Sequence, residues 1–364
     1  MTSALPGGHL AFPNACPAIP RPGPPVCAVV VDAEEDFDWL NPVYGTRHTA
    51  ANMGHIRTLQ EIAGAHRLVP AYLLTYPILD SPGVVAMLRR RLERGECEAG
   101  VQLHPWVTPP YDAGSASATS FAGHLAPELE RRKLVELARK FTECFGVAPR
   151  MYRAGRYGLG EQSFGLLEEL GFTIDTSLAP RTSFAGEGGP DFSGFDYRPF
   201  WFGMRSRVLE LPLCREVVGW SGALAPSVYQ AALAPGLARL RLPAVVTRAR
   251  CAERITLSPE GNDTAAMRRL VRRLLDAGQR LFALSFHSSS LVVGSNPYVQ
   301  TKAELHGFYD RLSGILEFMA DGCGMRFSPL SGMPDALLPP DARAPAPLGA
   351  PTHPPGAGRP GLAA

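Results

Sequence analysis

The stretch Val26-Cys-Ala-Val-Val-Val-Asp-Ala-Glu-Glu-Asp-Phe-Asp38 (VCAVVVDAEEDFD) joins an uncharged apolar run to five acidic residues. The run Val26–Val31 has the length and the β-branched content of a buried strand. Carboxylates that follow such a strand directly face one another at its end, where one can hold a cation and another can accept a proton. A solvated acidic turn is the alternative interpretation of this cluster when it is taken alone.

Working outward, short apolar runs alternate with segments of helical periodicity. The predicted strands are Val26–Val31, Leu68–Thr75, Glu98–His104, Arg207–Leu213 and Arg280–Phe286. The predicted helices are Val84–Arg94, Pro127–Phe145, Gln162–Leu170, Thr264–Ala277 and Lys302–Met319. This alternation indicates the α/β class, with a parallel sheet, helices outside it and a closed or nearly closed barrel. Functional residues are then expected at the carboxyl ends of the strands.

Composition limits the domain organisation and the partners. The chain has 364 residues, of which 45% are hydrophobic, and 36 basic against 34 acidic residues give a net charge of +2. That balance predicts no nucleic-acid partner. Segment 1–25 holds seven prolines and segment 334–364 holds nine. Because proline lacks a backbone donor, we expect 1–25 and 331–364 to be disordered and 26–330 to form the folded domain.

The sequence also suggests a compartment. Its seven cysteines are scattered and form no C-x-x-C pair, which favours reduced thiols in the cytoplasm. The first residues have neither a basic nor an apolar signal region, so no secretion signal is expected. No apolar stretch of about 18 residues occurs, so no membrane span is expected either. The oligomeric state is not readable.

Four further polar patches follow predicted strands. They are QLHPW with His104, YRAGRYG with Arg153 and Arg156, the segment 174–177, and SFHSSS with His287. Each has an ordinary structural interpretation, as a packed histidine or a surface turn. Their order at successive strand ends, after the acidic cluster, predicts that they form one site.

Together these motifs resemble those of the NodB-type polysaccharide deacetylases, carbohydrate esterase family 4 and its relatives. The resemblance spans roughly 26–330 and is carried by DAEEDFDW (32–39), LHPW (103–106), YRAGRYG (152–158), LSPEGN (257–262) and SFHSSSLVVGSNPYV (285–299). It looks closest to the WalW-like branch that is found with exopolysaccharide genes. The resemblance implies a distorted (β/α)7-type barrel, the NodB homology domain. It also implies a divalent metal, commonly zinc, that assists hydrolysis of an N-acetyl amide, a non-peptide C–N bond.

The motif order implies roles for individual residues. Asp32 matches the catalytic base, and His287 matches the late histidine that acts as general acid. Arg153 matches the arginine that positions the base, with Arg156 as an alternative because this motif is one residue longer. The metal-binding acid is expected just after Asp32.

Glu34 and Glu35 are the two candidates for that acid, with a slight preference for Glu34. The family usually supplies two metal histidines with three residues between them, whereas this chain offers Gln102 and His104. Residues two apart on a strand share a face, so both could still reach one cation. An amide oxygen is a weaker zinc donor than an imidazole, so we expect the metal to be bound more weakly at this site.

Other residues could complete the site. His48 and His55 follow the acidic cluster and would reach it if their loop folds back, although a surface position and a helical position are the plainer expectation. Trp106, Tyr111 and Tyr157 are candidate substrate-binding residues that could stack on a sugar ring, and Arg156 is a further candidate.

The predicted function is therefore a metal-dependent hydrolase that removes N-acetyl groups from a sugar or polysaccharide intermediate. One alternative is a catalytically impaired carbohydrate-binding protein on the same fold. The other is a hydrolase of another non-peptide C–N bond.

Overall fold

The structure is a computed structural model and describes residues 10–37, 39, 48–111, 120–205, 207–233 and 242–340. Residues 1–9 and 341–364, which are parts of the two segments expected to be disordered, lie outside the described residues, as does Asp38 of the acidic cluster. Within the described ranges, no helix is both long enough and apolar enough to cross a bilayer.

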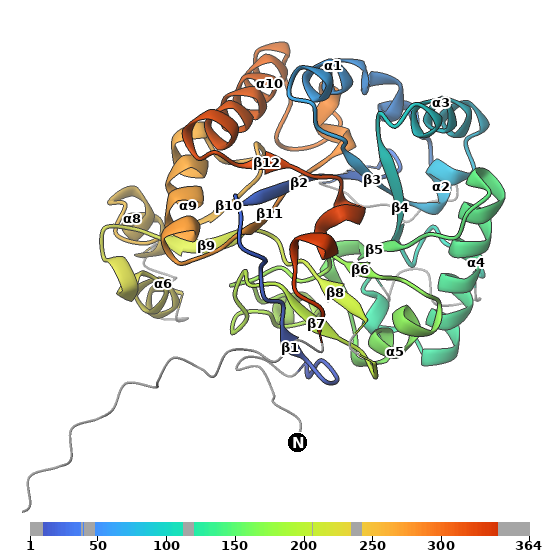
Figure 1. The fold of residues 1–364 in the computed structure, drawn as a ribbon, viewed down its shortest axis with the longest axis horizontal. Helices are drawn as coiled ribbons and strands as arrows, with labels where there is room; N and C mark the ends of the chain where they lie inside the picture. Colours follow the sequence, from blue (N-terminus) through green and yellow to red (C-terminus); the bar gives the residue numbers. More distant parts are fainter. Residues whose placement is uncertain are drawn as a thin grey trace, which may run out of the picture.

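A curved parallel sheet forms the centre of the molecule (Figure 1). Seven described strands pair in parallel in the order β11-β2-β3-β4-β5-β6-β8. They are β2 (Val26–Ala33), β3 (Ala71–Leu74), β4 (Glu98–Leu103), β5 (Met151–Ala154), β6 (Ile174–Asp175), β8 (Val208–Glu210) and β11 (Leu281–His287). The predictions of an α/β class and of a parallel sheet are confirmed.

Two backbone hydrogen bonds bridge the two ends of this curved sheet. The Ser285 N–H of β11 donates to the carbonyl of Leu257 (3.2 Å), and the Leu257 N–H donates to the carbonyl of Cys214 (2.8 Å), shortly after β8. The sheet is therefore a distorted barrel that is closed by irregular backbone where β8 and β11 do not pair directly.

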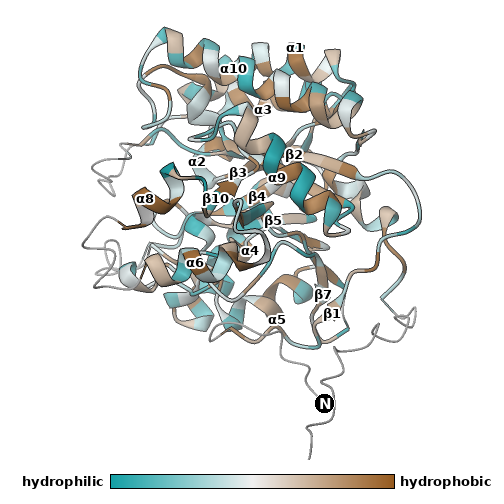
Figure 2. Cartoon of the chain, turned by 90° about the vertical axis from the view of Figure 1, so that its left-hand side faces the viewer, coloured by the Kyte–Doolittle hydropathy of each residue, from teal (hydrophilic) through white to brown (hydrophobic). Residues whose placement is uncertain are grey.

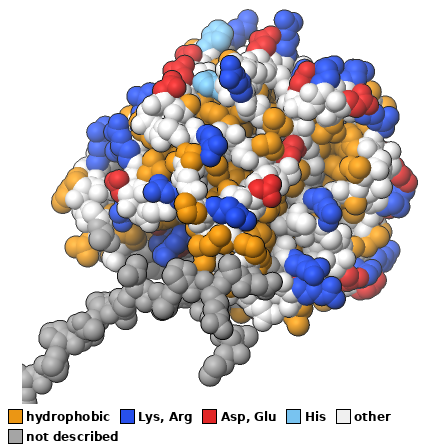
Figure 3. Space-filling view, in the orientation of Figure 1, with side chains coloured by type: hydrophobic (Ala, Val, Ile, Leu, Met, Phe, Trp, Pro, Cys, Tyr) orange, Lys and Arg blue, Asp and Glu red, His pale blue; other side chains and the backbone are white. Residues whose placement is uncertain are grey.

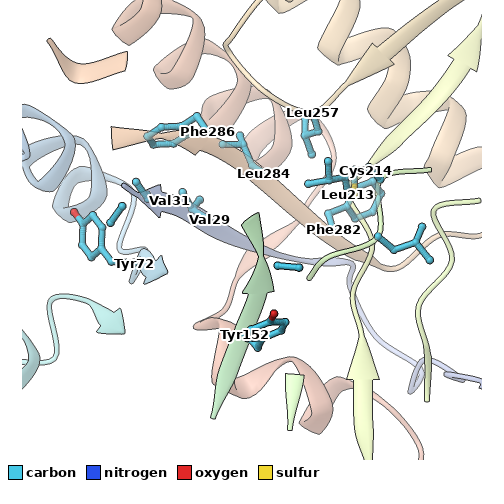
Figure 4. Close-up of a cluster of buried hydrophobic side chains, with 14 of the residues drawn as sticks. Val29, Val31, Tyr72, Tyr152, Leu213, Cys214, Leu257, Phe282, Leu284 and Phe286 are labelled. Carbon is cyan, nitrogen blue, oxygen red and sulfur yellow. The ribbon is translucent and has the colours of Figure 1, made fainter. Parts of the chain in front are cut away.

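The pleat of each strand separates two cores. On β2, Val29 and Val31 pack into the large cluster between sheet and helices, part of which is drawn in Figure 4, whereas Ala28 and Val30 belong to a second cluster on the opposite face. Because successive side chains alternate between faces, Asp32 continues the Ala28–Val30 face to the carboxyl end of the strand.

Helices cover the outer face of the sheet. They are α1 (Arg57–Ala65), α2 (Tyr76–Leu79), α3 (Pro82–Glu93), α4 (Pro127–Phe145), α5 (Glu161–Glu169), α9 (Thr264–Asp276) and α10 (Lys302–Glu317). Helix α9 shows why they pack this way: its buried residues recur at helical spacing, and the Asp263 carboxylate caps its first turn by accepting from the Ala266 N–H (2.6 Å). Figure 2 shows the resulting mixture of hydrophilic and hydrophobic residues on α9 and α10.

A small lobe extends from this barrel on the left of Figure 1. Its strands β9 (Arg215–Val218) and β10 (Glu253–Thr256) pair antiparallel, and α6 (Ala225–Ala232) and α8 (Leu242–Arg248) pack against them. On the face of the molecule drawn in Figure 3, basic and acidic side chains are scattered with apolar ones between them.

The expectation that the whole of 1–25 is disordered is corrected for residues 10–25. Strand β1 (Cys16–Pro17) pairs antiparallel with β7 (Phe200–Phe202), which itself pairs with β8. Proline is compatible with this position because β1 is an edge strand, where a missing donor costs no ladder bond. The ordered part also extends past residue 330, since the helix η8 (Leu330–Ala336) packs against β2, near strand β12 (Arg326–Phe327).

Phe12 anchors this N-terminal segment. Its ring packs against those of Phe164, Phe195, Phe200 and Phe202, with centroid distances between 4.3 and 5.7 Å. We predict that Phe12→Ala lowers the free energy of unfolding by about 3–5 kcal/mol, because it removes a buried ring and leaves a cavity. Urea denaturation followed by circular dichroism measures this change.

The matched control is Val147→Ala, since Val147 is 63% exposed. We expect that variant to change the free energy of unfolding by less than about 0.5 kcal/mol. Equal stabilities of the Phe12→Ala variant and the wild type would show that the N-terminal segment does not belong to the folded core.

Candidate active site

A cavity of about 480 Å³ opens at the carboxyl ends of the parallel strands. Asp32 of β2, Gln102 of β4, Arg153 of β5 and His287 of β11 all line it. The strand register brings them together, because His287 lies opposite Asp32 and Gln102 lies opposite Arg153. Residues separated by more than 250 positions in the sequence therefore meet at one edge of the sheet.

Asp32 and Arg153 form an ion pair inside the protein. Arg153 is 1% exposed, and its Nη1 donates to Asp32 Oδ1 at 2.5 Å. Its Nε donates to the carbonyl (3.1 Å) and the hydroxyl (3.0 Å) of Thr176, which fixes the guanidinium. Burial lowers the pKa of Arg153, but Asp32 outweighs this effect and the pKa is raised. The pair holds one carboxylate oxygen of Asp32, while the other lies 3.6 Å from His287 Nε2.

Glu34 and His104 approach each other next to this pair. His104 Nε2 lies 3.3 Å from Glu34 Oε1 and 3.2 Å from Gln102 Nε2, which donates to the same Glu34 oxygen at 2.7 Å. Burial lowers the pKa of His104, but the carboxylates of Glu35 and Glu34 have the larger combined effect and raise the pKa to about 10. The three side chains thus form a polar cluster on the cavity wall.

Glu35 lies behind His104 and does not belong to the cavity lining. Its Oε1 accepts from the Trp106 indole at 3.1 Å and lies 2.9 Å from His104 Nδ1. A carboxylate in this position fixes the orientation and tautomer of an imidazole whose other nitrogen faces the site. Of the two candidate acids, only Glu34 is placed to contact a cation in the cavity.

Glu260 holds His287 in the same manner, and sequence reasoning did not single it out. Its Oε2 lies 2.9 Å from His287 Nδ1, and its Oε1 accepts from the His287 backbone N–H at 2.8 Å. Burial lowers the pKa of His287, but Glu260, Glu34 and Asp32 raise it to about 10. The motif LSPEGN contains Glu260, but nothing in its pattern indicates a partner 27 residues later.

The donor set is suited to a divalent cation. Oxygen or nitrogen atoms of Asp32, Glu34 and His287 lie within 4.8 Å of one another, and these residues could hold a metal. Gln102 Oε1 is buried and has no hydrogen-bond partner among the described residues. An amide can be turned so that its oxygen replaces its nitrogen. In that orientation Glu34, His104 and Gln102 would offer a carboxylate, an imidazole and a carbonyl donor to one ion.

The turn after β5 shapes the floor of the cavity. A Cβ added to Gly155 would lie 2.4 Å from His104 Cδ2 and 2.7 Å from the Leu103 carbonyl, so only glycine allows His104 to approach this closely. Arg156 and Tyr157 follow with φ angles of +54° and +58°. Such conformations are unfavourable for residues with a Cβ and are often found at functional sites.

Three of the four predicted substrate-binding residues line the cavity: Trp106, Arg156 and Tyr157. The Trp106 ring stacks on His104 at 4.2 Å, and Arg156 pairs with Glu187. The fourth, Tyr111, is 66% exposed and lies outside the lining.

His48 also lines the cavity, whereas His55 is exposed on the short helix η1 (Ala51–His55). The lining further contains residues that the sequence analysis did not propose as site residues. Phe37, Trp39 and Tyr298 lie within the quoted motifs, whereas Phe184, Arg215 and Thr256 lie outside them.

Comparison with known proteins supports the fold. No family model matches the chain, and no curated protein matches it. Among solved structures, PuuE allantoinase is similar with 11% identity and a TM-score of 0.50, over 87% of this chain and 91% of that one. At that identity the likeness shows a shared fold.

Two further structures are similar to a lower degree. A candidate polysaccharide deacetylase from Mycobacterium smegmatis shares 16% identity over 89% of this chain and 95% of its own, with a TM-score of 0.49. A CE4 family pseudoenzyme from Bacillus anthracis shares 7% identity over 87% of this chain and 67% of its own, with a TM-score of 0.41.

The buried ion pair leads to a stability prediction. Arg153→Met removes the ion-pair partner that holds the buried Asp32 carboxylate, and we expect the free energy of unfolding to fall by about 3–5 kcal/mol. Adding Asp32→Asn should recover a large part of this loss, since the carboxylate that has lost its ion-pair partner is then replaced by a neutral amide. Urea denaturation of the two single variants and the double variant measures the coupling. Strictly additive effects would contradict the interaction described here.

Proposed function

We propose that this protein is a metal-dependent hydrolase that removes N-acetyl groups from a sugar or a polysaccharide intermediate. The observation that carries the proposal is the convergence of Asp32, Glu34, His104 and His287 on one cavity at the carboxyl ends of the strands. The motif resemblance to NodB-type deacetylases supports the same reaction. Glu34, His104 and Gln102 would hold the cation, with Asp32 and His287 beside it.

A divalent cation bound there would act as a Lewis acid, which would polarise the acetyl carbonyl and lower the pKa of the attacking water. The second oxygen of Asp32, which Arg153 leaves uncovered, would accept the proton of the attacking water. Arg153 holds Asp32 in the orientation that this step requires.

His287 would then donate a proton to the nitrogen of the departing amine. Its three carboxylate neighbours favour the protonated imidazole at neutral pH, as a general acid requires. Glu260 would keep the ring oriented, so it acts as a positioning residue.

The finer parts of the proposal rest on the resemblance. We propose zinc as the ion, membership of the WalW-like branch, and a cytoplasmic intermediate of exopolysaccharide synthesis as the substrate. Trp106 and Tyr157 would provide aromatic surfaces for the sugar.

A second candidate is a carbohydrate-binding protein without catalysis. It is favoured by Gln102, whose amide nitrogen donates to Glu34 where a metal histidine would be expected. Glycan binding that persists in chelator, together with no acetate release under any metal supplementation, would favour this candidate.

The catalytic roles can be tested by substitution. We expect Asp32→Asn and His287→Ala each to lower kcat for acetate release from N-acetylated sugars by about 10²–10⁴-fold, the usual contribution of general acid–base groups. The measurement is an enzyme-coupled acetate assay. His55→Ala is the matched control, because His55 is exposed outside the cavity. Unchanged kcat in either active-site variant would contradict the proposed mechanism.

Metal binding should release protons. His104, with its pKa raised to about 10, is protonated at pH 7 in the absence of a cation, but it must be neutral to coordinate one. We therefore predict that zinc added to chelator-treated protein at pH 7 displaces at least about one proton, and that zinc affinity rises as the pH increases towards 10. Calorimetry in buffers of different ionisation enthalpy counts the protons. A count near zero would contradict coordination by His104.

A further inference from the structure

Arg215 lines the same cavity from the small lobe. It is the first residue of β9 and lies opposite Thr256 of β10, which also lines the cavity. The barrel strands β2 and β11 contribute Asp32 and His287 to the cavity, and this wall adds a cation to Arg153 of β5. Nothing in the proposed hydrolysis uses Arg215.

In the described part of the chain, the hydrogen-bond partners of the Arg215 guanidinium are uncharged. Its Nε donates to Thr256 Oγ1 at 2.8 Å, and its Nη1 donates to Thr182 Oγ1 at 2.6 Å. A guanidinium has five N–H donors, so most of its capacity is not used by these two hydroxyls. Among the described residues, no carboxylate forms an ion pair with Arg215.

Three other arginines of this region differ in this respect. Arg153 pairs with Asp32, Arg156 with Glu187, and Arg181 with Glu216 at 2.9 Å. Among the described residues, Arg215 is therefore the one cavity-lining arginine without a carboxylate partner.

The surroundings make a lone charge at this position costly. Arg215 is partly buried, and this desolvation lowers its pKa, as does the nearby positive charge of Arg254. Taking a charge out of water without a partner is unfavourable, and an anion in the cavity would remove that cost. Arginine is suited to this role because its planar fork binds carboxylates and phosphates through two parallel hydrogen bonds.

We propose that Arg215 binds an acidic group, a carboxylate or a phosphate, on the N-acetylated sugar. This inference rests on the proposed function and narrows its substrate class from N-acetylated sugars in general to acidic ones. The acetamide would lie beside Asp32 and His287, while the acidic group lies against the wall formed by Arg215 and Thr256. Tyr157, whose ring centroid lies 5.8 Å from the Arg153 guanidinium carbon, also lines the cavity.

Binding is tested separately from catalysis. Calorimetry of the wild-type protein would use D-glucose as the neutral probe, D-glucuronate as the carboxylate probe and D-glucose 1-phosphate as the phosphate probe. We expect at least one acidic probe to bind more tightly than glucose, and the stronger of the two identifies the group. In Arg215→Met, the preference for that probe over glucose should fall by about 30-fold or more, as for the loss of a buried charge partner.

Arg254→Met is the matched control, since it removes the same charge from the neighbouring strand outside the cavity. We expect it to change the preference by less than about fivefold, because exposed charges are screened by solvent. Arg215→Lys, which keeps the charge but loses the planar fork, should retain part of the preference.

Three outcomes would overturn the inference: equal binding of all three probes, no binding of either acidic probe, or an unchanged preference in Arg215→Met. A purely structural Arg215 would reveal itself as a lowered melting temperature of Arg215→Met with that preference intact. Acetate release is measured in parallel. Selective binding of an acidic probe without acetate release would contradict the proposed hydrolase activity and support the anion site at Arg215. Acetate release without selective binding would support the hydrolase activity and contradict the anion site.

Discussion

The parallel register of β11, β2, β4 and β5 is the constraint on which the candidate site depends. Parallel strands end at one edge, and the pleat directs alternate residues to the same face. Asp32, Gln102, Arg153 and His287 occupy that face at that edge, so they meet although they lie far apart in the chain. A shift of one residue in any of these strands would turn its polar side chain towards the helices, where the packing is apolar.

Three polar side chains of the site are each supported from behind by a partner of opposite charge. Arg153 supports Asp32, Glu35 supports His104, and Glu260 supports His287. These pairs offset the free-energy cost of burying a charge. They also leave the second polar atom of Asp32, His104 and His287 directed to the cavity. Arg215 lacks such a partner within the described part of the chain, which is why a partner from the substrate is proposed for it.

Much of this arrangement follows from local sequence. The apolar run before Asp32 and the alternation of Gln102 with His104 predicted strands whose polar residues share one face, and the parallel sheet and the cavity agree with that prediction. The sequence left Glu34 and Glu35 unresolved, although the alternation that places Asp32 on the inner face extends naturally to Glu34. Glu260, Arg215 and Tyr298 could not be predicted, because their positions depend on the small lobe and on long loops. Phe12 was missed for a related reason: its proline-rich surroundings suggested disorder, while its partners lie more than 150 residues away.

The central claim is that Glu34 and His104 bind one cation beside Asp32 and His287. Crystals grown with zinc, with diffraction recorded on both sides of the zinc absorption edge, test it most directly. The account predicts one strong anomalous peak between Glu34 Oε1 and His104 Nε2, within bonding distance of both. A fully ordered cavity without a peak, or zinc bound only elsewhere on the protein, would contradict it.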